Sequence, residues 1–375
     1  MRASSTALPD VLKGSFNKRY VADFFADGDR VLHDVPVTNV QLSDSGSSLV
    51  QGTGSCTIVY QDDFGKELSP NAIGDLFSPF GTQVALSVII TAGAGFIERI
   101  PLGRYLISET PSIITTRFLF NGGVLSKGDR IDISLKDLFY GVQRDRFAVP
   151  GTPPSLTSVW VEVQRLTGLP VTKRITDGPI STTVAYQEDK LQAVYDLATV
   201  LDGTACMLSD GTVSMRPNVW PAPVDTLSWG DGGTLVDVGR GMANDLVYNQ
   251  IIVRSYNSGT AAAVLASAEI TSGPLRTQNV DGSLSPYRRV PYFFSSQFIT
   301  TADQAQAYAN LTLPRVSSLR SVSVVLTEIF NPLREVGDVL DIYRLGEMFT
   351  GRITDISRDG GGTQQTTVSV IGHPS

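Results

Sequence analysis

The clearest indication of the fold is the pattern of residues 79–108, which read PFGTQVALSVIITAGAGFIERIPLGRYLIS. Two apolar runs of strand length, 82–90 and 103–108, stand on either side of the glycine-rich turn 91–95. Neither run approaches the length of about 18 residues that a membrane-spanning helix needs. The pattern therefore predicts a β domain of short strands joined by turns.

The same organisation extends over residues 29–134, with a further strand at 55–60. Residues 134–137, Ser-Leu-Lys-Asp, resemble a capping box and predict a short helix through Phe139. Prolines within 150–154 then interrupt regular structure, because proline continues neither a helix nor a central strand. We expect the first domain to span residues 1–150.

After this boundary, the spacing of the apolar residues changes to that of a helix. Apolar residues at helical spacing predict a helix over 156–166 that Gly168 ends, and a second helix over 191–201. Strands at 205–208 and 212–215 then enclose the turn Ser209-Asp210-Gly211. We expect residues 151–233 to form a helix-helix-hairpin domain followed by the Pro- and Gly-rich connector 217–233.

The third domain is expected over residues 234–375, with strands resuming at 246–255. Its polar stretch 257–291 is interpreted as a surface excursion. Thr301 and Gln304 form a capping box that begins a helix ending before Pro314. Four final strands are expected at 321–328, 339–344, 349–357 and 366–371. The predicted fold class is mainly β with an α+β insert.

A short echo links the first and last domains. Residues 103–108 read GRYLIS, and residues 351–357 read GRITDIS. Each segment follows a β segment and leads into a turn. Chance similarity between two strands is one explanation of this echo.

Composition and charge limit the possible partners. The net charge is −7, which argues against a surface that binds nucleic acid through clustered Lys and Arg. The best basic patch, Arg288-Arg289 beside Tyr287 and Tyr292, is too small to offset this charge. The N-terminal residues lack the apolar core of a signal peptide, so we expect synthesis in a cytoplasm without a membrane anchor.

The sequence contains few of the residues and motifs that catalysis usually requires. The chain has two histidines, His33 and His373, and two cysteines, Cys56 and Cys206, which we expect to be buried free thiols. Hydrolase elbows, zinc-protease helices and Walker loops are absent from the sequence. We therefore expect no catalytic, cofactor-binding or metal-binding residues and no cofactor.

Structural roles account for the acidic and glycine-rich segments that could suggest a binding site. Asp62 and Asp63 are expected in a turn, and Asp129, Asp132 and Asp137 lack EF-hand spacing. The glycine-rich stretches, 230–233 and 360–362, read as turns. Spacing alone leaves open a glycosidase that uses an Asp/Glu pair.

The order of these segments resembles the minor tail and tail-tip hub proteins of siphophages, notably those that infect actinobacteria, and the baseplate hubs of tailed phages. The resemblance covers residues 20–372, except for 257–291, which has no counterpart. Its motifs are PFG (79–81), PLG (101–103), RDRF (144–147), DG (210–211), VSMRP (213–217), GDV (337–339) and GRITDI (351–356).

The resemblance implies a homotrimer in the tail tip of a virion, and the missing catalytic residues and motifs predict that it is not an enzyme. Each subunit would contribute two tube-like β-barrel domains, 1–150 and 234–375, so that three subunits match a sixfold ring. The implied partners are the distal tail protein ring, a central tail fibre or spike and the C-terminus of the tape-measure protein. Genomic DNA would pass through the hub channel without sequence-specific binding.

Two alternatives stay open. One is a distal tail protein, which forms a hexameric ring. The other is a cell-wall carbohydrate hydrolase that uses an Asp/Glu pair.

Overall fold

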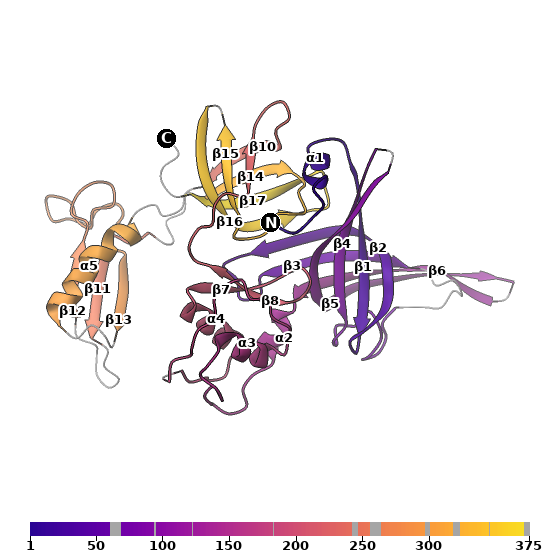
Figure 1. Ribbon diagram of the computed structural model, residues 1–375, viewed down its shortest axis with the longest axis horizontal. Coiled ribbons are helices and arrows are strands. Elements are labelled where there is room, and N and C mark those ends of the chain that lie inside the picture. The colour runs from indigo at the N-terminus through magenta and orange to yellow at the C-terminus, as the bar shows by residue number, and fades with distance from the viewer. Residues whose placement is uncertain are drawn as a thin grey trace. The chain divides into compact units, whose positions relative to one another are not determined.

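The computed structural model divides into two compact units (Figure 1). Unit 1 comprises Met1–Val238 and Val325–Val368, and unit 2 comprises Gly239–Val324 and Ser369–Ser375. The predicted third segment, 234–375, thus contributes to both units. The structure describes residues 1–60, 69–93, 95–121, 123–182, 184–241, 247–255, 264–296, 301–317, 323–344 and 346–370.

A sheet of twelve strands dominates the described part of unit 1. Ten of them follow the order β1-β4-β5-β6-β3-β2-β16-β17-β14-β10. The other two lie off this path, where β15 pairs with β16 and β9 pairs with β15. Its first strands are β1 (Asn17–Ala26), β2 (Asp29–Ser45), β3 (Gly52–Tyr60), β4 (Gln83–Ala92), β5 (Phe96–Phe120) and β6 (Gly123–Asp137). The others are β9 (Asp225–Ser228), β10 (Leu235–Gly241), β14 (Ser323–Ile329), β15 (Val339–Arg344), β16 (Glu347–Arg358) and β17 (Thr363–Val370). The mainly β class is confirmed, with a large, mostly antiparallel sheet and few helices.

The first six strands pair in a closed cycle. Strand β1 pairs with both β2 and β4, and the path continues through β5, β6 and β3 back to β2. The residues Val84, Leu86, Val88 and Ile90 of β4 are fully buried and face the core, and Ser87 and Ile89 between them are buried as well. The predicted strands are present but longer than expected, because register shifts let β5 bend and continue for 25 residues.

The distal half of the β5–β6 hairpin forms an arm, defined here as residues 114–130, which extends from the sheet in Figure 1. Strand β4 pairs with β5 only as far as Leu106, and β3 pairs with β6 only from Asp129 onward. The outer part of the arm is therefore a two-stranded ribbon, a form that is marginally stable in water without further packing.

The helical insert follows, with α2 (Phe139–Arg144), α3 (Val159–Thr167), α4 (Lys190–Val200), β7 (Gly203–Met207) and β8 (Val213–Pro217). Its order confirms the predicted helix-helix-hairpin segment, and Gly168 ends α3 in the left-handed conformation. The capping box predicted at 134–137 is wrong, because these residues continue β6. Helix α2 begins at Phe139, whose N–H donates to Asp137 Oδ1 at 3.0 Å.

Ser158 caps the N-terminus of α3, and replacing it tests how much this cap stabilises unit 1. Its hydroxyl accepts from Val161 N at 3.1 Å and donates to Asp177 Oδ2 at 2.7 Å. Ser158→Ala should lower the free energy of unfolding by about 1 kcal/mol, since an unsatisfied helix N–H replaces the cap. Urea unfolding followed by tryptophan fluorescence checks this, with Ser4→Ala at an exposed position as the control. Equal midpoints for both variants would contradict it.

Tryptophan fluorescence reports on unit 1 alone, because Trp160, Trp220 and Trp229 all lie in it. Trp160 is completely buried between the insert's helices.

Unit 2 is a three-stranded sheet covered by one helix in its described residues. The strands β12 (Val264–Glu269), β11 (Gln250–Ser255) and β13 (Pro291–Ser296) pair in this order, and α5 (Ala302–Ser317) packs on them. The aromatic rings of Phe294 and Tyr308 stack with centroids 4.2 Å apart. The helix was expected to end before Pro314, which is wrong: it continues through Pro314 to Ser317, although the missing N–H of Pro314 leaves the Asn310 carbonyl without its usual helical donor.

Several elements were not predicted. They are the helix α1 (Leu8–Leu12) and the strands β1, β9, β10, β12 and β13. Strand β9 lies inside the predicted connector and pairs in parallel with β15. Strand β12 lies inside the predicted surface excursion and pairs with β11.

The four predicted final strands are confirmed as β14 to β17. Gly360, at φ +79°, allows the turn between β16 and β17, as its glycine-rich sequence predicted. Within the described residues, none of the helices is both long and apolar enough to cross a membrane.

Candidate functional site

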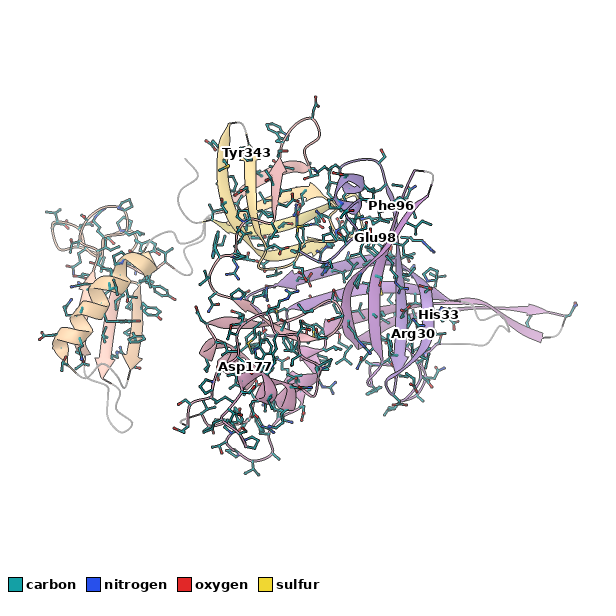
Figure 2. The ribbon with its side chains drawn as sticks, in the orientation of Figure 1. Arg30, His33, Phe96, Glu98, Asp177 and Tyr343 are labelled. Atoms are coloured by element: carbon teal, nitrogen blue, oxygen red, sulfur yellow. The ribbon has the colours of Figure 1, made fainter. Side chains whose placement is uncertain are left out.

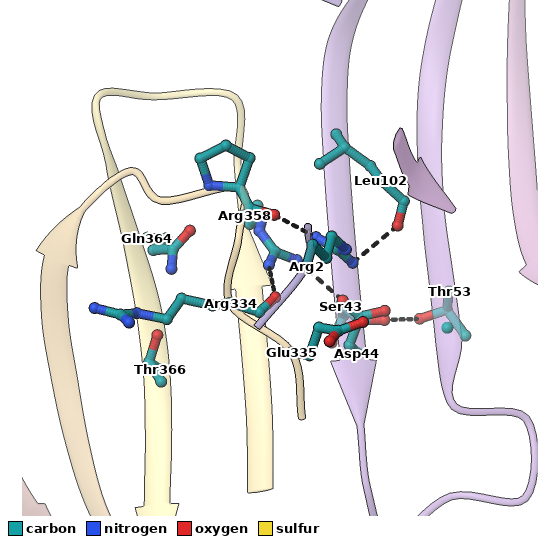
Figure 3. Close-up of polar contacts among 12 residues, drawn as sticks. Arg2, Ser43, Asp44, Thr53, Leu102, Arg334, Glu335, Arg358, Gln364 and Thr366 are labelled. Carbon is teal, nitrogen blue, oxygen red and sulfur yellow. Dashed lines mark hydrogen bonds and ion pairs between the residues drawn. The ribbon is translucent and has the colours of Figure 1, made fainter. Parts of the chain in front are cut away.

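A buried cluster of charged residues lies where the N-terminus, β2 and β16 meet (Figure 3). We call it the junction. Arg358 at the end of β16 is 1% exposed, and its Nη1 donates to Asp44 Oδ2 on β2 at 3.0 Å. Its Nη2 donates to the Arg334 carbonyl at 2.9 Å. This guanidinium joins the closed set of six strands to the C-terminal strands beside the β2–β16 pairing.

Arg334 forms the second part of the junction and is also fully buried. Its guanidinium contacts Glu328 Oε2 at 3.1 Å and Asp225 Oδ2 at 2.9 Å. The other carboxylate oxygen of Glu328 accepts from Gln364 Nε2 at 2.8 Å and Thr366 Oγ1 at 2.6 Å. The two carboxylates hold the pKa of Arg334 above its usual range, although burial opposes this shift. The buried ions are thus paired and hydrogen-bonded, as buried charges must be.

The N-terminus is the third part. The Met1 ammonium pairs with Asp338 and lies 3.5 Å from Glu335 Oε2. The Arg2 guanidinium donates to the Pro332 carbonyl at 2.6 Å and to the Leu102 carbonyl on β5 at 3.0 Å. The first two residues therefore fasten the C-terminal loop to β5.

Asp137 faces the junction from the end of β6. It is 3% exposed, and burial raises the pKa of its carboxyl to about 7, although backbone N–H groups of Gly52 and Phe139 oppose the shift. The negative charge of Asp44 raises this pKa further. Burial also raises the pKa of Tyr105 above its usual range. The Asp137 carboxyl is therefore only partly ionised at pH 7.

The insert reaches the junction through its hairpin. Gln51, which precedes β3, donates to the Tyr195 hydroxyl and to the Ala205 carbonyl, both at 2.9 Å, and accepts from Arg216 on β8. The buried thiol of Cys206 lies near Arg216, and burial raises its pKa. Both cysteines, Cys56 and Cys206, are buried free thiols, which confirms the expectation from the sequence.

The sequence echo lies on the two sides of the hairpin. Arg104 on β5 packs so closely on Gly211 that an added Cβ there would lie 2.7 Å from Arg104 Cδ. Arg352 on β16 donates to the Pro217 and Asn218 carbonyls at 2.7 and 3.0 Å. Each Gly-Arg segment thus supplies an arginine that contacts one end of the β7–β8 hairpin.

The candidate calcium cluster does not form. Asp129 and Asp137 face the core on β6, whereas Asp132 points to the other face and accepts from Thr57 Oγ1 at 2.6 Å. Residues 129 and 137 are eight positions apart, which corresponds to roughly 26 Å along a strand. Among the residues that the structure describes, no group of three or more His, Cys, Asp or Glu side chains is placed to hold a metal ion.

The remaining candidates are scattered. The His33 side chain is 72% exposed at the surface of β2 (Figure 2). Arg288 lies in a loop of unit 2, where its carbonyl accepts from Asn249 Nδ2 at 2.6 Å. His373, Asp62 and Asp63 lie outside the described residues.

Sequence reasoning missed the buried charges of the junction, although strand periodicity held a signal for two of them. Val324, Leu326 and Glu328 stand two residues apart on the core face of β14. Arg358 follows the buried Ile356 by two residues on β16. A charge in phase with a buried apolar face predicts a buried ion pair, but it does not identify the partner.

The fold of this chain is similar to the folds of known proteins. No protein-family profile matches the sequence, and no curated protein matches it. The fold is similar to that of the tail protein from Neisseria meningitidis MC58, with a TM-score of 0.56 and 12% identity over 94% of this chain and 96% of the other. It is also similar to the prophage MuSo2 43 kDa tail protein from Shewanella oneidensis, with a TM-score of 0.54 and 13% identity over 94% and 98% of the two chains. Both likenesses show a shared fold.

Proposed function

We propose that the chain is a non-enzymatic tail-tip hub of a bacteriophage, a homotrimer that joins the tail tube and the distal tail ring to a central fibre or spike. The observation that carries the proposal is the shared fold with two tail proteins, one of them from a prophage, over nearly their whole lengths. The central fibre or spike and the C-terminus of the tape-measure protein would contact the trimer, and genomic DNA would pass through its channel during ejection. The protein would act in the virion tail tip after synthesis in the host cytoplasm.

The arrangement of unit 1 supports two tube-like domains per subunit. Six strands pair in a closed cycle, as the strands of a barrel do, and the C-terminal strands attach to this set through the β2–β16 pairing. The two Gly-Arg segments occupy related positions on either side of the β7–β8 hairpin. Two related domains in each of three subunits would match a sixfold ring.

The arm supplies a surface for contact between subunits. Ile114 and Leu119 are 52% and 78% exposed, and the ribbon that carries them lacks a third strand in the described residues. Apolar side chains on such a ribbon are stabilised when another chain covers them.

The mass of the assembled protein tests the proposal. Light scattering after size exclusion should give three times the chain mass of 40.3 kDa. A mass six times that of the chain would support the distal tail ring instead. Release of sugar from host cell wall by the purified chain would support the carbohydrate hydrolase and would overturn the hub.

Variants of the arm test the contact between subunits. Ile114→Ser combined with Leu119→Ser should shift the trimer to monomers at micromolar concentration, since the exposed apolar area would no longer favour association. Val149→Ser removes an apolar side chain that is 74% exposed elsewhere and should leave the mass unchanged. A trimer that persists in the double variant would exclude the arm from the interface.

A further inference from the structure

A cavity of about 70 Å³ lies inside unit 1, beside the junction. The N-terminal segment, β5, the insert and the loop before β15 surround it. Its charged lining residues include the guanidinium groups of Arg2, Arg104, Arg174 and Arg216. Three carboxylates, those of Asp44, Asp137 and Glu335, also line it.

The carboxylates are already engaged with other groups. Asp44 pairs with Arg358 at 3.0 Å, and Glu335 lies 3.5 Å from the Met1 ammonium. Asp137 accepts backbone N–H groups, and its raised pKa of about 7 leaves it partly neutral at pH 7. Each carboxylate therefore has a partner other than the arginines of the cavity, and Glu335 also lies 4.0 Å from Arg174.

The guanidinium groups, in contrast, have mostly neutral partners. Arg2 donates to two carbonyls and Arg216 to the amide oxygen of Gln51. The Nε atoms of Arg2 and Arg216 are buried and have no hydrogen-bond partner among the described residues. Arg174 approaches Glu335 only to 4.0 Å. Buried donors of this kind require a bound water or ion.

We propose that the cavity binds a small tetrahedral oxyanion, such as inorganic phosphate or sulfate, through Arg2, Arg174 and Arg216. The planar guanidinium group suits such an anion because it offers paired N–H donors. The three arginines come from the N-terminus, the loop after α3 and β8. The bound anion would therefore hold the N-terminus against the insert, and its binding would stabilise the folded state by mass action.

Calorimetric titration of the full chain with inorganic phosphate, in chloride buffer at constant ionic strength, tests the site. We expect one anion per chain and a thermal midpoint that rises with phosphate concentration. Arg174→Gln and Arg216→Gln should each weaken binding at least tenfold, roughly the loss expected from one charge-assisted hydrogen bond. Arg174→Gln is the cleaner variant, because its side chain is 44% exposed.

Arg146→Gln is the matched control, since this arginine is 61% exposed and lies outside the cavity lining. Its phosphate affinity should equal that of the unmodified chain. Sulfate should compete with phosphate, whereas added chloride should not. The proposal is overturned if no heat of binding is detected, or if phosphate and sulfate raise the midpoint equally in all variants, which indicates general exclusion from the surface.

Discussion

Replacing Arg334 with methionine should reduce the free energy of unfolding of unit 1 by about 3–5 kcal/mol, because the variant leaves the buried carboxylate of Glu328 without its cation. Methionine retains much of the apolar length of arginine, so the loss reports charge rather than volume. Asp225 is 38% exposed and can be solvated, whereas Glu328 is completely buried. Urea unfolding followed by tryptophan fluorescence measures the effect.

Two further variants test whether the unpaired charge of Glu328 causes the loss of stability in Arg334→Met. Adding Glu328→Gln to Arg334→Met should recover part of the loss, since the unpaired charge is removed and the amide oxygen still accepts from Gln364 or Thr366. Lys173→Met breaks an exposed ion pair with Asp177 and should cost less than about 1 kcal/mol. A double variant no more stable than Arg334→Met would show that the uncompensated charge is not the cause.

The local patterns predicted local structure well. Gly168 and Gly211 marked the end of a helix and a hairpin turn because both positions require positive φ, which glycine adopts without strain. The apolar run from Val84 to Ile90 predicted a strand, which the structure confirms as part of β4. These features depend on residues close together in the chain.

Long-range features were harder to predict. Ser134 to Asp137 matched a capping box, but pairing with β3 and β5 keeps these residues in β6, so tertiary contacts override the local signal. The ion pair between Arg358 and Asp44 joins residues 314 positions apart. Periodicity marks such a charge as buried, but only the fold brings its partner to it.

Asp137 should make the stability of unit 1 fall as pH rises from about 4 to 7. Its folded-state pKa of about 7 exceeds the ordinary value of 3.8, so the folded protein keeps a proton that the unfolded chain releases in this range. The shift corresponds to roughly 4 kcal/mol, and roughly 3 kcal/mol of it should appear between pH 5 and 8. Above about pH 8 the contribution is constant.

The difference between the unmodified chain and Asp137→Asn isolates this effect. Asparagine carries no charge, so the variant should lose this part of the pH dependence, although its lost acceptor lowers stability at every pH. Asp132→Asn is the matched control, because Asp132 lies on the same strand but on the opposite face. Urea midpoints from tryptophan fluorescence between pH 5 and 8 should fall in the unmodified chain and in Asp132→Asn, and less in Asp137→Asn. Parallel profiles for all three proteins would show that the Asp137 carboxyl is already ionised in the folded state, and that the junction stabilises its charge.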